Sequence, residues 1–149
     1  MTATALAHGF GRCCGPVPGA TVAEAMIRFP KTCPHTTTVH QARESFRDGH
    51  VHALLVVDRG VLLAVVERGD LDGRPAAAPV RCYGATRGRT TSPDADLSGV
   101  RDAMRTDGRR RLAVVDEHGS LLGLLCLKRT GDGFCSDAGI AARARERRL

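Results

Sequence analysis

One pattern occurs twice in this chain, and it limits the fold more than any other feature of the sequence. Residues 54–66 hold two apolar runs joined by a turn at Gly60, and residues 112–125 hold two similar runs around a turn at Gly119. Two unrelated hairpins rich in Val, Leu and Gly are the alternative interpretation. Repetition in the same order favours two copies of one supersecondary unit, neither of which can bury its apolar surface alone.

Capping residues and apolar spacing predict the elements of the first copy. Thr38 and Gln41 have capping-box spacing at the start of a helix that buries Val39, Ala42 and Phe46. The near-continuous apolar strands indicate a sheet that is covered on both faces. The predicted elements are a helix at 21–26, an extended segment at 32–34, a helix from 38 to about 48, and strands at 53–57 and 61–66.

The second copy predicts the same order of elements. Its strand at 90–93 precedes a helix capped by Asp96 and two further strands, and a last helix is expected after Ser136. We therefore expect an α+β fold of two pseudo-symmetric repeats, each strand-helix-strand-strand-helix, packed through their sheets. Leu54, Val56, Leu112 and Val114 should be buried. The expected boundaries are a flexible arm at 1–20, the first repeat at 21–74, a linker and the second repeat at 75–130, and a helical segment at 131–149.

The composition narrows the location and the class of function. The six cysteines show no Cys-x-x-Cys spacing, and the chain has neither a secretory signal nor a long apolar run, so we expect reduced thiols in the cytoplasm and no membrane. Cys126 should act as a small hydrophobic residue. His8, Cys13 and Cys14 could suggest a metal, but adjacent cysteines chelate one ion poorly, and no metal is expected.

The net charge of +6 comes almost wholly from arginine, while aromatic residues make up only 3% of the chain. Proteins that bind single-stranded nucleic acid stack bases on aromatic rings, so nucleic-acid binding is disfavoured here. No nucleophile–base pair, carboxylate dyad or metal set emerges, and the sequence does not indicate an enzyme.

Each copy resembles a cystathionine β-synthase (CBS) domain, and the tandem resembles a CBS pair, or Bateman module. The residues that carry the resemblance in the first copy are 21–26, Pro34, 39–42, Gly49, 54–58 and 70–71; in the second they are Pro93, 112–116, Gly119 and 122–125. The resemblance implies a regulatory module of the stand-alone bacterial type. Many relatives bind AMP, ATP or another adenosyl compound between the repeats, and they commonly form homodimers.

The resemblance also implies where a nucleotide would bind. In the family the third strand runs into a Gly-x-x-Thr-x-x-Asp pattern whose Asp accepts both ribose hydroxyls. Asp70 holds this position in the first copy, but Glu67 replaces the Thr and would repel multiply phosphorylated ligands. The second copy has Cys126 and Arg129 instead, which implies that ribose recognition is lost there.

The other residues of this implied site come from neighbouring segments. His52, Ala53 and Leu54 would form the adenine wall, with Cys33 and Pro34 at the opposite edge. Asp70 could instead simply cap a helix that begins at Leu71. Arg109 and Arg111 could clamp a phosphate or lie in a solvated charged loop.

Two functions from different classes follow. The first is a regulatory module that senses an adenine nucleotide or a related adenosyl compound. The second is a ligand-free scaffold for dimerisation or for an unidentified protein partner.

Overall fold

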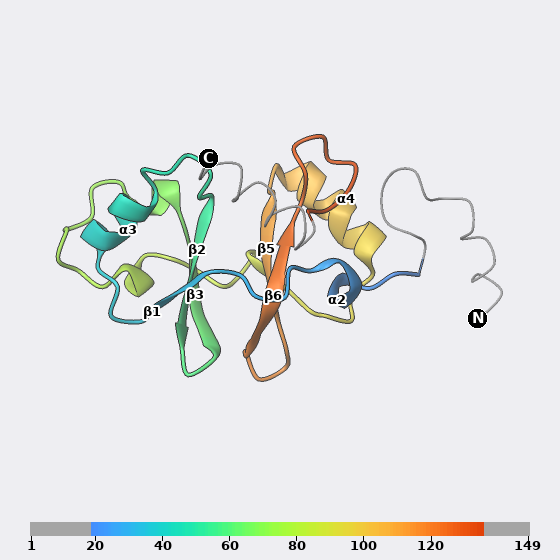
Figure 1. Cartoon of the computed structure of the whole chain (residues 1–149), viewed down its shortest axis with the longest axis horizontal. Helices are drawn as coiled ribbons and strands as arrows, with labels where there is room; N and C mark the ends of the chain where they lie inside the picture. The colour runs from blue at the N-terminus through green and yellow to red at the C-terminus, as the bar shows by residue number, and fades with distance from the viewer. Residues whose placement is uncertain (1–18, 136–149) are drawn as a thin grey trace, which may run out of the picture.

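The computed structural model describes residues 19–135, which form two three-stranded sheets that lie side by side (Figure 1). In each sheet the first strand pairs in parallel with the second, and the second pairs antiparallel with the third. The predicted α+β repeat is therefore confirmed. The strands are β1 (Thr32–Pro34), β2 (Ala53–Asp58), β3 (Val61–Glu67), β4 (Thr90–Thr91), β5 (Arg111–Val115) and β6 (Leu121–Cys126).

The predicted helix caps are present. At the start of α3 (Val39–Ser45), the Gln41 N–H donates to Thr38 Oγ1 (3.1 Å), and the Thr38 N–H donates to Gln41 Oε1 (2.9 Å). Asp96 accepts the Gly99 N–H (2.9 Å) at the start of α4 (Leu97–Asp107). The other helices are α2 (Val22–Ala25) and the 3₁₀ helices η2 (Arg68–Leu71) and η3 (Val80–Cys82).

Burial within the strands differs in part from the sequence prediction. Val56 and Val114 are fully buried, as predicted, but Leu54 and Leu112 are only half-buried. Leu55 and Ala113, their neighbours on the opposite faces of β2 and β5, are buried instead. The inward face of each sheet packs on the other repeat, which buries Leu55 and Ala113. The outward face of the first sheet packs on α3, whereas that of the second packs on α4 and also on α2, which precedes the first sheet in the chain.

The two hairpins make the contact between the repeats. An apolar cluster that includes Leu55, Val65 and Ala113 fills the space between the sheets. At the hairpin tips, the Leu62 N–H donates to the carbonyl of Gly119 (3.0 Å), and the Leu121 N–H donates to that of Gly60 (2.9 Å). The repeats thus pack through their sheets, as the sequence predicts.

The segment between the repeats packs on the first one. The N–H of Val39 donates to Ala78 O (2.9 Å), and that of Val80 donates to Thr37 O (2.9 Å). Val80 is fully buried in the core of the first repeat. The group His8, Cys13 and Cys14, at which no metal is expected, and the helix expected after Ser136 lie outside the described residues.

Candidate functional site

Asp70 lies where the last strand of the first repeat turns into η2. Its Oδ2 accepts the backbone N–H of Glu67 at 2.7 Å, which closes the turn that leads into the 3₁₀ helix. The helix that Asp70 supports therefore begins at Arg68 rather than at Leu71. This bond shows that Asp70 has a local structural role, whatever else it binds.

Arg89, the residue before β4, holds Asp70 from the second repeat. Its Nη1 donates to Asp70 Oδ2 (2.6 Å) and its Nη2 to Oδ1 (3.2 Å), while Nη1 also donates to the carbonyl of Val65 (2.7 Å). The Arg89 and Asp70 side chains are only 16% and 19% exposed. Bidentate pairing of this kind is the strongest form of arginine–carboxylate contact.

Glu67 completes the arrangement. It forms an ion pair with Arg109, which lies just before β5, and its Oε1 is 3.4 Å from Nη2 of Arg89. We call Glu67, Asp70, Arg89 and Arg109 the junction cluster. Two carboxylates of the first repeat face two guanidinium groups of the second, so the four charges cancel.

The cluster sets the ionisation of Asp70. Burial raises the pKa of Asp70, but the hydrogen bonds from Arg89 and from the Glu67 N–H, with the charges of Arg89 and Arg109, lower it by more. The pKa of Asp70 therefore lies below its ordinary value, and the carboxylate stays charged at neutral pH.

This lowered pKa predicts a pH-dependent stability. A carboxylate with a depressed folded-state pKa stabilises the fold above its unfolded value of 3.8, and the contribution is lost as the pH falls through the folded value. At pH 7 the wild type should have a higher Tm than Asp70→Asn, and this difference should shrink as the pH falls below 3.8 and through the lowered folded-state pKa of Asp70. A difference in Tm that stays constant as the solution is acidified would contradict this prediction.

The other predicted residues divide into two groups. Ala53 is in register with Glu67, so Ala53, and His52 just before it in the chain, lie near the cluster. Burial, together with the charges of Arg111, Arg110 and other neighbours, lowers the pKa of His52.

Cys33, by contrast, is in register with Val56. It therefore lies about 10 Å along β2 from the position of Ala53. Cys33 and Leu54 pack against the core of the first repeat, and Pro34 is exposed.

Arg89 is the residue that sequence reasoning missed. A signal was available, because Lys31 precedes the first strand of the first copy as Arg89 precedes that of the second. Basic residues before short strands are common surface features, and only the folded chain places this one against Asp70.

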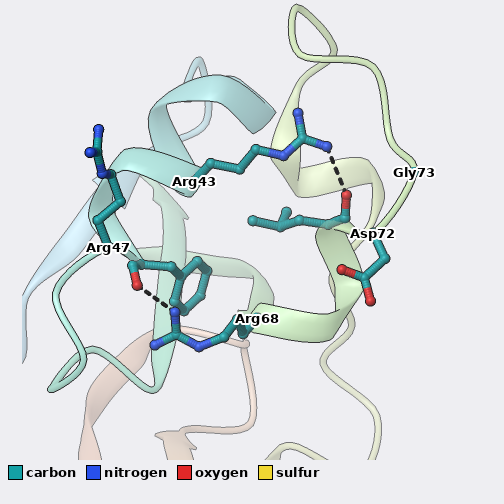
Figure 2. Close-up of a pocket in the computed structure, with 7 residues that line it drawn as sticks. Arg43, Arg47, Arg68, Asp72 and Gly73 are labelled. Atoms are coloured by element: carbon teal, nitrogen blue, oxygen red, sulfur yellow. Dashed lines mark hydrogen bonds between the residues drawn. The ribbon is translucent and has the colours of Figure 1, made fainter.

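A separate hollow of about 440 Å³ lies between the C-terminal end of α3 and η2 (Figure 2). Arg43 donates there to the carbonyls of Leu71 (3.0 Å) and Arg74 (2.8 Å), while Arg68 donates to those of Phe46 and Val51. These arginines satisfy carbonyl groups at the ends of α3 and η2 and in the loops that follow them, which is a structural role. The residues that line the hollow are Arg43, Phe46, Arg47, Arg68, Leu71, Asp72 and Gly73.

Two classes of feature are absent from the part of the chain that the structure describes. Among residues 19–135, no His, Cys, Asp and Glu side chains gather as a metal ion requires. No helix in the same range has the length and apolar character needed to cross a membrane.

The family profile described as CBS domain matches residues 22–74 and 86–129, which is more than half of the chain. The chain therefore belongs to the CBS domain family, and its two repeats form a CBS pair. No curated protein matches it in sequence.

Solved structures share the fold at low sequence identity. A protein assigned to acetoin utilization (AcuB) from Vibrio cholerae has 21% identity and a TM-score of 0.61, over 85% of this chain and 91% of its own. CBSX2, solved in complex with AMP, has 22% identity and a TM-score of 0.63, over 85% and 99%. The CBS domain pair of protein MJ0100, in complex with 5′-methylthioadenosine and S-adenosyl-L-methionine, has 15% identity and a TM-score of 0.57, over 87% and 99%.

Proposed function

We propose that this CBS pair is a regulatory module that binds an adenine nucleotide or another adenosyl compound at the junction cluster. The observation that carries the proposal is the placement of Asp70, an ionised carboxylate with two acceptor oxygens, beside two arginines of the other repeat. The Asp70 carboxylate matches a ribose diol, and the guanidinium groups of Arg89 and Arg109 match a phosphate. Similar structures with AMP and with S-adenosyl-L-methionine support this choice of ligand class.

Ligand binding at this site is an exchange of partners. Two ribose hydroxyls would take the Asp70 oxygens that Arg89 now holds, and the freed guanidinium would be available to a phosphate. Arg109 balances Glu67, which reduces the repulsion that Glu67 alone would exert on that phosphate. The exchange makes the contact between the repeats depend on the ligand, as a regulatory module requires.

The remaining lining is part of the same proposal. His52 and Ala53, with Leu54, would form the adenine wall. Cys33 and Pro34 would lie at the far edge, and Arg111 beside Arg109 would add positive charge.

A thermal-shift measurement tests the proposal with AMP, ATP and S-adenosyl-L-methionine. A ligand at a hundredfold excess over its Kd stabilises the folded state by about 2.7 kcal/mol. For a chain of this size the Tm should rise by about 5 to 10 °C. An unchanged Tm with all three compounds would count against nucleotide sensing.

The alternative is a ligand-free scaffold that serves dimerisation or a protein partner. The balanced charges of the junction cluster favour the scaffold, because Asp70 already accepts hydrogen bonds from the Arg89 guanidinium and the Glu67 N–H.

Arg89→Ala separates the two functions. It should lower the Tm by a few degrees in either case. If Asp70 binds ribose, the same change should also tighten adenosine binding, because the diol no longer competes with a guanidinium. Calorimetry with adenosine measures this, with exposed Arg87→Ala as the control. No measurable adenosine binding in either the wild type or Arg89→Ala would support the scaffold, and unchanged or weaker binding in the variant would mean that the ribose does not compete with Arg89 for Asp70.

We also propose that the protein works as a cytoplasmic homodimer. Phe29 is 91% exposed on the connection between α2 and β1, and a partner subunit would cover such a ring. Sedimentation at high micromolar concentration should give about twice the chain mass of 15.8 kDa. A species of the chain mass itself would contradict the dimer.

A further inference from the structure

Two cysteines meet at the end of the second sheet. Cys126, the last residue of β6, and Cys135 have their sulfur atoms 2.6 Å apart, and the Cys135 N–H donates to the carbonyl of Cys126 (2.7 Å). Their residues are only 3% and 8% exposed, and they form a small buried cluster with Ile27. Paired backbone and facing sulfurs on neighbouring extended segments give the approach that a disulfide requires.

The segment between them is a short loop that folds back on β6. The N–H of Lys128 donates to Gly133 O (2.8 Å), and Leu127 forms a bridge with Phe134. Gly131 takes a φ of +79° at the turn, in a conformation that favours glycine. The two cysteines are thus held at the base of a ten-residue loop, rather than meeting by chance on two mobile segments.

The place of this pair within the repeat is informative. Cys126 is in register with Arg111 as Glu67 is with Ala53, so Cys126 holds in the second repeat the position of Glu67 in the first. The first repeat has a carboxylate of the junction cluster at this position. The second has a thiol with another thiol against it.

We infer that Cys126 and Cys135 are a redox pair that closes to a disulfide under oxidation and so fastens the loop 127–135 to β6. With a hydroperoxide as oxidant, the first thiolate attacks one oxygen of the O–O bond and becomes a sulfenic acid. The other oxygen takes up the proton that the thiol lost and leaves as water or an alcohol. The second thiol then attacks that sulfur and releases water. For hydrogen peroxide the balance is two thiols and one peroxide giving one disulfide and two waters.

The surroundings set the order and speed of these steps. Cys135 is the more exposed of the two residues, at 8% against 3%, so its sulfur is the one that meets the oxidant. Burial raises the pKa of the Cys126 thiol to about 11, so this sulfur stays protonated until it attacks the sulfenic acid beside it. Oxidation is therefore slow, and the buried disulfide resists reductants while the protein stays folded.

Peptide mapping of the full chain tests the pairing. Trypsin cuts after Lys128 and Arg129, so the disulfide joins peptides 112–128 and 130–143. After full reduction, treatment with hydrogen peroxide in the presence of a metal chelator and alkylation of remaining thiols, mass spectrometry should find this joined pair, lighter by two hydrogen atoms than its separate parts. Recovery of both peptides alkylated, or joined to peptides with other cysteines, would overturn the inference.

A second measurement tests the fastening of the loop. Closing a loop of this length should raise the Tm of the oxidised protein by about 5 to 10 °C over the reduced protein. Cys135→Ser should abolish both the joined peptides and the shift. Cys82→Ser, at an exposed cysteine, should leave both in place. An equal Tm for oxidised and reduced wild type, or a shift that persists in Cys135→Ser, would overturn the proposed fastening.

Discussion

Val56→Asp is expected to leave the chain unfolded. Val56 is fully buried in the cluster between β2 and α3, where a carboxylate would have no partner. Loss of the valine contacts and burial of a charge together cost more than about 4 kcal/mol, a large part of the 5 to 15 kcal/mol that stabilises a typical domain. Circular dichroism at 25 °C should show loss of the native spectrum.

The control for this variant is Leu63→Asp. Leu63 lies on β3 but is 37% exposed, so its carboxylate can stay hydrated and the cost should be below about 1 kcal/mol. The conservative Val56→Ala, followed by urea unfolding, should cost about 2 kcal/mol through the cavity that it leaves. A folded Val56→Asp with wild-type stability would show that the described core is wrong.

Asp70→Asn is expected to weaken the binding of AMP by roughly ten- to over a hundredfold. The amide keeps one acceptor oxygen but presents a donor where the second acceptor stood, so it no longer matches two ribose hydroxyls. Loss of hydrogen bonds to a charged group typically costs about 1.5 to 3 kcal/mol, which is the basis of this range. Calorimetric titration with AMP measures the change.

Asp72→Asn is the matched control, because it removes the same charge two residues away, beyond the junction cluster and beside the separate hollow (Figure 2). Glu67→Thr restores the residue that resembling proteins have and should strengthen AMP binding more than adenosine binding. Part of that gain comes from Arg109, which loses its carboxylate partner and becomes available to the phosphate. Equal AMP affinity in Asp70→Asn and wild type would mean that Asp70 only supports η2.

The sequence predicts the burial of Cys126 but not its contact with Cys135. Cys126 in an apolar strand looks like a small hydrophobic residue, and it is indeed buried. Its partner Cys135 follows a turn of Gly and polar residues with no periodicity, so no sequence pattern places Cys135 against β6. Sulfur contacts at the base of a loop depend on how the loop folds back.

The sequence by itself determined the repeat, the strand order and the helix caps of this protein. These features depend on local chemistry: Thr38 with Gln41 and Asp96 with Gly99 are three residues apart, and the apolar runs around Gly60 and Gly119 pair as neighbours along the chain. Local interactions of this kind do not require knowledge of how the repeats pack.

Only the tertiary structure decided what surrounds Asp70. Arg89 is 19 residues from Asp70 and Arg109 is 42 from Glu67, and both pairs cross the junction between the repeats. The packing of Leu55 and Val65 against Ala113 sets the position of that junction. Whether an arginine near a strand end is solvated or bound to a carboxylate depends on this packing, because charge pairs require a few ångströms of proximity that sequence distance does not specify.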